Sequence, residues 1–142
     1  MPGIKSEKKY LLDTSALLAL WNEEEGADTV EKLLQGAARK RQTVLGSFMT
    51  HMEAYYRLWK SQGEETAREF YHQLKILPLV RIDLDEAILL MAAEIKATKS
   101  LSVADSWIIA TGLVHQAAIV HKDPEFEQVK DLIPLLTLPY KV

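Results

Sequence analysis

The chain has 142 residues, enough for one domain with a buried core. Hydrophobic residues make up 48% and charged residues 26%, values that are ordinary for a globular domain. The absence of cysteine excludes disulfides, thiolate zinc sites and a cysteine nucleophile. The formal net charge of -3 neither indicates nor excludes a nucleic-acid binder, whose domain usually carries a basic face.

No apolar run approaches the roughly 20 residues that a membrane-spanning helix needs, so we expect no membrane segment. The chain start lacks a signal-peptide cleavage pattern, and a chain without cysteine suits a reducing cytosol. We therefore predict a cytoplasmic protein with a flexible N-terminal tail over residues 1–7 and a single domain over residues 8–142.

Short apolar runs alternate with helical periodicity along the chain. A strand is predicted over 10–12, followed by a helix that Thr14 or Ser15 could cap. A second helix is predicted over 27–39, and the next strand over 43–45 is expected to be broken by Gly46.

The segment from Thr50 to Glu53 matches the capping-box pattern, so the next helix is predicted to begin there and to run to about residue 60. The remaining predicted elements are helix 64–77, strand 79–82, a helix to 95 capped by Asp83 or Asp85, a helix to 114 capped by Ser102, strand 117–120 and strand 135–138. Strands separated by helices indicate parallel βαβ units. The predicted fold is a three-layer α/β/α sandwich with a four- to five-stranded parallel sheet.

Four carboxylates fall where such a sheet binds ligands, at the carboxyl ends of its strands. Asp13 directly follows the first strand, and Asp123 lies three residues after the strand ending at Val120. Glu53 and Asp105 each lie in the first turn of a predicted helix. Tertiary folding could bring all four to one crevice.

Carboxylates that are packed together repel one another unless a cation compensates their charge. Mg²⁺ or Mn²⁺ would supply that charge and prefers oxygen ligands, and such an ion can activate water against a phosphodiester. If four acids bind metal, 17 basic side chains face the remaining 16 acidic ones.

Each acid also has a structural explanation. Asp13 could cap the helix that follows it, and Asp123 before Pro124 could begin a turn. Glu53 could close the capping box, and the Asp105 carboxylate could interact favourably with the positive N-terminal end of the dipole of its helix. These alternatives stay open residue by residue.

Four blocks of the sequence together resemble one family, the PIN domains. The blocks are residues 11–18 (LLDTSALL), 48–53 (FMTHME), 101–110 (LSVADSWIIA) and 118–126 (AIVHKDPEF). Their order and spacing fit the family over about residues 9–138. The short single-domain form looks most like the VapC toxins of toxin–antitoxin modules.

The resemblance implies strand order 3-2-1-4-5 and Mg²⁺- or Mn²⁺-dependent endoribonuclease activity carried by Asp13, Glu53, Asp105 and Asp123. It also implies a homodimer and an antitoxin partner that covers the site. Thr14 matches a family hydroxyl that supports the metal cluster. The chain departs from many relatives at His121, where they have Thr or Ser, and Glu125 matches a position that is often acidic. Thr14, His121 and Glu125 are thus candidates for support around the metal.

Basic and aromatic side chains add possible RNA contacts that the sequence does not rank. The segment 39–41 could bind phosphates or simply place positive charge at a helix C-terminus. Other possible phosphate contacts are Lys8, Lys9, Arg57, Lys60 and Lys122. Aromatic residues at helical spacing could stack on bases, but their apolar neighbours favour a core or an oligomer interface; they are Trp21, Tyr55, Tyr56 and Trp59.

The sequence thus predicts a metal-dependent endoribonuclease acting as the toxin of a type II toxin–antitoxin module. The alternatives are an RNA-processing PIN nuclease that is not a toxin and a non-catalytic PIN-fold binding module. A phospho-accepting signalling domain fits less well, because such domains usually use an adjacent acidic pair near the first strand. Here Asp13 is followed by Thr14 and Ser15.

Overall fold

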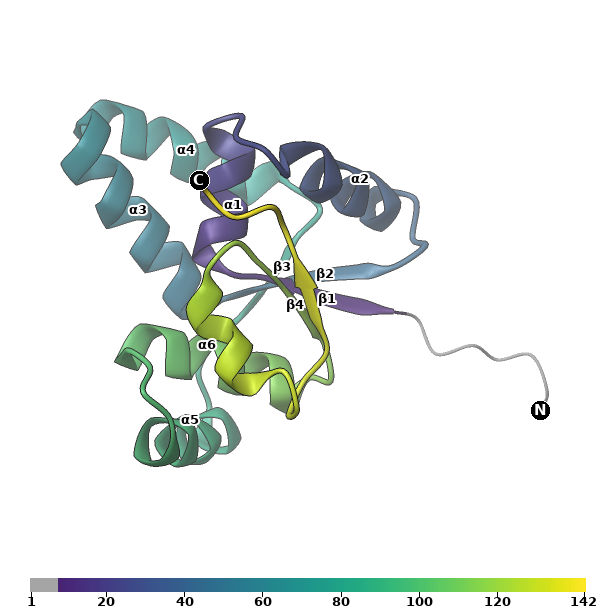
Figure 1. The fold of residues 1–142 in the computed structure, drawn as a ribbon. Helices are drawn as coiled ribbons and strands as arrows, with labels where there is room; N and C mark the ends of the chain where they lie inside the picture. Colours follow the sequence, from purple (N-terminus) through teal and green to yellow (C-terminus); the bar gives the residue numbers. More distant parts are fainter. Residues whose placement is uncertain (1–7) are drawn as a thin grey trace.

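A computed structural model describes residues 8–142, and the predicted tail over 1–7 lies outside them. Five parallel strands form one sheet in the order β3-β2-β1-β4-β5 (Figure 1). The strands are β1 (Lys9–Leu12), β2 (Thr43–Ser47), β3 (Val80–Ile82), β4 (Ala118–His121) and β5 (Leu135–Thr137). The predicted parallel sheet and its strand order are confirmed.

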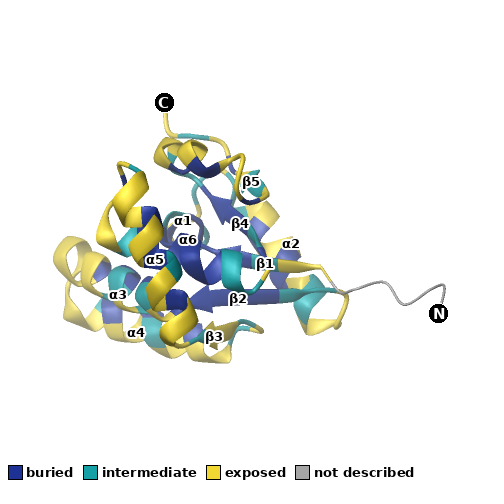
Figure 2. Ribbon diagram, turned by 90° about the horizontal axis from the view of Figure 1, so that it is seen from below, coloured by how far each residue is buried: buried dark blue, intermediate teal, exposed yellow. Residues whose placement is uncertain are grey.

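Helices cover both faces of the sheet and complete the three layers. One face carries α1 (Thr14–Trp21), α2 (Ala27–Ala38), α3 (Phe48–Gln62) and α4 (Glu64–Ile76), and the other carries α5 (Glu86–Thr98), α6 (Val103–Val114) and the 3-10 helix η1 (Pro124–Val129). Because side chains alternate along a strand, Leu12 packs into the first layer and Leu11 into the second. Figure 2 shows the resulting buried central strands between exposed outer helix faces.

The chain reverses its direction across the sheet between β1 and β4. The strands β1, β2 and β3 are added outward to one side, and the chain then returns through α5 and α6 to place β4 on the other side of β1. Ligand sites of open α/β sheets lie at such a switch point, outside the carboxyl ends of the strands. Asp13 and Asp123 follow the two strands that flank it.

Two sequence expectations around β2 are wrong. Gly46 does not break the strand, which continues to Ser47. A Cβ atom at Gly46 would approach the side chains of Leu79 and His51 within 2.9 and 3.0 Å, so the glycine instead allows close packing. The capping box is not formed either, because Ser47 caps α3 through a bond from the Met49 N–H and Thr50 lies buried within the helix.

The other helix starts follow the expected chemistry with one change. Of the three caps that the sequence offered for α1, Asp13 is the one used and Thr14 and Ser15 are not, because the Asp13 carboxylate accepts the Ala16 N–H. Asp85 and Ser102 cap α5 and α6 as predicted. Among the described residues, no helix combines the length and the apolar composition needed to cross a bilayer.

Candidate active site

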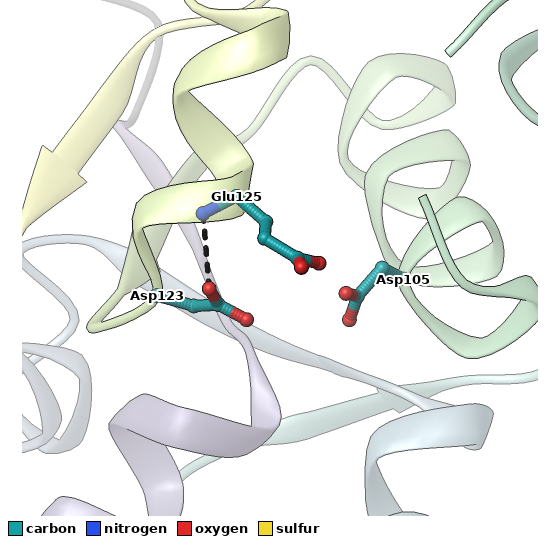
Figure 3. Close-up of side chains that lie close together, drawn as sticks. All are labelled: Asp105, Asp123 and Glu125. Carbon is teal, nitrogen blue, oxygen red and sulfur yellow. Dashed lines mark hydrogen bonds between the residues drawn. The ribbon is translucent and has the colours of Figure 1, made fainter. Parts of the chain in front are cut away.

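Three carboxylates meet at the carboxyl edge of the sheet. Asp105 lies in the first turn of α6, Asp123 follows β4, and Glu125 lies in η1. One carboxylate oxygen from each residue lies within 4.8 Å of the others (Figure 3). The structure thus joins two of the four predicted ligands, Asp105 and Asp123, to a residue that the sequence suggested only as a supporting candidate.

Glu125 reaches the group because of the turn that follows Asp123. The Asp123 side chain caps η1 by accepting the Glu125 N–H at 3.0 Å, and Pro124 occupies the first helical position. In Figure 3 the Glu125 side chain extends from this turn toward Asp105. The Asp-Pro-Glu sequence after a strand is the signal for it, because an Asp that caps a short helix through the N–H two residues later places the backbone of that residue beside its own carboxylate.

Asp13 lies beside this group but is held mainly by its own helix. Its side chain is only 2% exposed, and its Oδ1 accepts the Ala16 N–H at 2.8 Å. The Ser15 hydroxyl lies 2.8 Å from both carboxylate oxygens. Burial raises the pKa of Asp13 to about 7, and the charges of Asp105 and Asp123 add to this rise. Asp13 is thus both a helix cap and a neighbour of the acidic group.

Glu53 approaches the group from α3. The pKa of Asp105 is raised to about 6, mainly by burial and further by the negative charges of Glu53 and Asp123. Ser47 caps α3 three residues before the predicted start, so Glu53 is not engaged as a capping-box residue. Four carboxylates, those of Asp13, Glu53, Asp123 and Glu125, therefore lie within electrostatic reach of Asp105, although among the described residues only Asp105, Asp123 and Glu125 form the close group.

No ion pair within residues 8–142 joins a basic side chain to any of these five carboxylates. Two oxygens bound to one Mg²⁺ lie at most about 4.2 Å apart, since each Mg–O bond is about 2.1 Å long. The oxygens of Asp105, Asp123 and Glu125 would therefore need to move only slightly to share an ion. The donor set fits a hard divalent cation, and the uncompensated negative charge favours one.

Ser15 connects the acids to the segment after β4, a role that the sequence analysis missed. Its hydroxyl donates to Asp13 and accepts the backbone N–H of Lys122 at 2.8 Å. Thr14, which the family resemblance favoured, has a buried hydroxyl with no hydrogen-bond partner among the described residues. A serine two residues after an acidic helix cap was the available signal, because its hydroxyl can reach back to that carboxylate.

His121 contacts the backbone of Asp123 from beneath the site. Its buried ring accepts the Asp123 N–H on Nδ1 at 3.2 Å, and Nε2 lies 3.0 Å from the Thr137 hydroxyl. Burial lowers the pKa of His121, so the ring is neutral at neutral pH. Because Nδ1 accepts, Nε2 carries the proton and donates it to Thr137. This arrangement positions the turn, whereas a proton shuttle would need contact with solvent.

Comparisons with known proteins agree with this fold. A family model described as the PIN domain matches residues 10–132. No curated protein sequence matches the chain significantly.

Solved structures show the same fold at low sequence identity. The structure of VapBC2 from Rickettsia felis bound to a promoter DNA fragment has a TM-score of 0.74 and 17% identity, covering 92% of this chain and 99% of that one. DNA-bound VapBC from Salmonella typhimurium has a TM-score of 0.73 and 20% identity, covering 92% of this chain and 98% of that one. VapC20 from Mycobacterium tuberculosis, described as a Sarcin–Ricin loop cleaving toxin, has a TM-score of 0.70 and 17% identity, covering 92% of this chain and 99% of that one.

Proposed function

Because the chain belongs to the PIN domain family, whose members are typically nucleases, we propose that it is a metal-dependent endoribonuclease. The observation that carries this proposal is the close group of Asp105, Asp123 and Glu125 at the switch point of the sheet. The likeness to the solved structures supports the fold, and RNA as the substrate class follows from the family resemblance.

Asp105, Asp123 and Glu125 would hold the divalent ion, Mg²⁺ or Mn²⁺, with Asp13 and Glu53 beside them. A bound ion of this kind supplies a water of lowered pKa and stabilises negative charge on phosphate oxygens. Ser15 and the Ala16 N–H hold the Asp13 carboxylate in place, and His121 holds the turn that presents Asp123. In the reaction, a water oxygen would lose a proton to solvent and add to phosphorus, while the bond from phosphorus to the leaving ribose oxygen breaks and that oxygen takes up a proton.

The biological setting that we propose is the toxin of a type II toxin–antitoxin module in the cytoplasm. Similar structures come from toxin–antitoxin complexes, which supports an antitoxin protein as the partner. We further propose a homodimer formed through α3, where Phe48, Met52, Tyr56 and Trp59 are 43–49% exposed. A monomer by light scattering at micromolar concentration would contradict the dimer.

The nuclease proposal is tested with the purified chain and a panel of single-stranded RNAs in Mg²⁺ or Mn²⁺. We expect Asp105→Asn to lower cleavage by ~10³-fold or more, because metal assistance supplies several kcal/mol. The matched control is Asp131→Asn, an exposed acid that precedes β5 at the opposite edge of the sheet.

Undiminished cleavage by Asp105→Asn, or by the wild-type chain in excess chelator, would contradict the mechanism. Absence of metal binding at millimolar Mg²⁺ or Mn²⁺ would favour the non-catalytic binding module. An accompanying gene for a small DNA-binding protein would distinguish a toxin from an RNA-processing nuclease.

A further inference from the structure

A cavity of about 370 Å³ opens directly beside the acidic group, and its lining includes Asp123 of that group and Ser15, which donates to Asp13. One wall is α1, through Ser15, Leu18 and Asn22. The facing wall is the second half of α3, and the turn after β4 and the C-terminal segment close the remaining sides. The Gln62 side chain donates to Asn22 at 3.1 Å and thereby links the two walls. The cavity is thus a built extension of the site.

Helix α3 runs from the acids to this cavity along one of its faces. Glu53, Arg57 and Ser61 are spaced four residues apart, so they lie on the same side of the helix. At one end of this helix face, the charge of Glu53 raises the pKa of Asp105. Farther along the same face, Arg57 and Ser61 line the cavity. Arg57 is exposed and forms no ion pair with any residue of the described part of the chain. Its guanidinium is available to an anion.

A buried lysine forms a second positive group of the cavity. The Lys122 side chain is 4% exposed, and its Nζ donates to Glu24 at 3.2 Å and to the Glu25 carbonyl at 2.8 Å. An ammonium group has three N–H donors, so one remains. The cavity therefore contains a cation that the fold holds in a fixed place.

Glu24 only partly offsets the positive charge around it. Its other carboxylate oxygen lies 3.4 Å from Lys141, which also lines the cavity. Burial would raise the pKa of Glu24, but its hydrogen bond with Lys122 and the charge of Lys141 together hold that pKa below its usual value. Three positive side chains, Arg57, Lys122 and Lys141, thus line the cavity together with two acidic ones, Glu24 and Asp123. The cavity keeps an excess of positive charge.

Hydrogen bonds connect the cavity rigidly to the acids. The backbone N–H of Lys122 donates to the Ser15 hydroxyl, which in turn donates to Asp13. An anion bound by Lys122 would therefore lie in a fixed relation to the carboxylates. A nuclease that cuts within a strand needs such a contact, because it positions the neighbouring phosphate and so the scissile bond.

We propose that this cavity binds one unpaired nucleotide adjacent to the scissile bond of the RNA, with its phosphate on Arg57, Lys122 and Lys141. The inference rests on the proposed nuclease function and extends it to the form of the substrate. The cavity lies at the small end of the ~300–1,000 Å³ that is typical of small-molecule sites, and a concave pocket excludes a stiff duplex. Proteins that bind single strands combine a positively charged groove along the backbone with aromatic side chains that stack on bases, and this cavity supplies the charged part.

The test measures binding of a fluorescent single-stranded RNA to the chain with Asp105→Asn, so that cleavage does not intervene. We expect Arg57→Gln to weaken binding by about tenfold, the scale of one charge-assisted hydrogen bond. It should also lower the slope of log K against log salt by about 0.7, the value for one phosphate contact on a single strand. Annealing the RNA into a duplex should remove the difference between Arg57→Gln and its parent.

The matched control is Arg41→Gln, which removes the same charge from an exposed arginine just before β2. Parallel strands begin at the edge opposite to the one where the acids meet, so this variant should keep the parent affinity and slope. In the chain with Asp105 intact, Arg57→Gln should raise KM for the RNA, and Arg57→Lys should restore part of the affinity.

If Arg57→Gln and Arg41→Gln reduce the affinity for the RNA equally, the proposal is overturned, because the change in net charge alone would then explain both losses. Unchanged RNA binding in Arg57→Gln with weaker binding of an antitoxin would also overturn it and would assign the cavity to a protein partner. If the wild-type chain cleaves RNA but the Arg57 variant binds normally, only the cavity assignment fails. If the wild-type chain cleaves no RNA in metal, the nuclease proposal fails, and the binding measurement still decides the cavity.

Discussion

The acidic group and the basic cavity share a border at Asp123 and Ser15, yet the protein treats their charges in opposite ways. In the cavity, Lys122 and Lys141 are paired with Glu24, so the positive side chains are held by the protein itself. The acids have no such partner among the described residues, and the pKa values of Asp13 and Asp105 are raised. Lys122 and Lys141 are thus balanced within the fold, whereas the acids and Arg57 have no partner of opposite charge among the described residues, and we propose that a cation and an RNA phosphate supply it.

The largest expected effect is on the pH dependence of stability in the metal-free protein. Burial raises the pKa of Asp13 from 3.8 to about 7, so the folded chain holds this proton more tightly than the unfolded chain. That stabilisation is complete below pH 4 and is lost as the pH rises toward and through 7. The shift corresponds to roughly 4 kcal/mol at most, since one pKa unit is about 1.36 kcal/mol.

Urea unfolding in chelator at pH 5 and pH 8 measures this effect. Asp13→Asn keeps a capping oxygen for the Ala16 N–H but cannot titrate, so its unfolding free energy should fall less between the two pH values. Mg²⁺ should restore wild-type stability at pH 8, because a ligand that binds the folded state stabilises it. The same pH dependence in Asp13→Asn and wild type would show that the acids are already compensated.

A smaller effect is expected from the acid that the structure adds to the predicted set. Glu125→Gln should weaken Mn²⁺ binding by at least ~10- to 100-fold, because it removes a proposed ligand and the loss of a group that only supports the ligands already costs that much. Titration calorimetry gives the affinity directly. The control is Glu127→Gln, another exposed acid of η1, which accepts a bond from the Tyr140 hydroxyl. Equal affinities for the two variants would remove Glu125 from the site.

The smallest effect concerns the cavity. Lys122→Met should lower the free energy of unfolding by about 1–2 kcal/mol, because it removes hydrogen bonds from a buried charged group while Glu24 keeps Lys141. Lys141→Met should cost ~0–1 kcal/mol, since this lysine is 74% exposed. Thermal or urea unfolding compares them. If the Lys141 variant is the less stable of the two, Lys122 is not the fixed cation of the cavity.

Several features could be read from the sequence because they depend on local order. Alternating runs and helical periods predicted the layers, and the positions of Asp13 and Asp123 after their strands predicted the edge where they lie. Helix starts were less certain, since Ser47 and Thr50 are both good capping residues. In the structure Ser47, the last residue of β2, caps α3, and this leaves Glu53 without a capping role.

The sequence by itself determined the sheet and the edge at which Asp13 and Asp123 lie, because parallel strands end at one edge and each acid follows a strand. Only the tertiary structure decided which oxygens meet. The turn of η1 brought Glu125 to Asp105 and Asp123. Asp13, buried as the cap of α1, lies close enough to Asp105 and Asp123 to feel their charges. Only folding, too, joined Arg57, Lys122 and Lys141 around one cavity, because they come from three segments far apart in the chain. Distances of a few ångströms between side chains depend on how whole layers pack, and no local pattern encodes that.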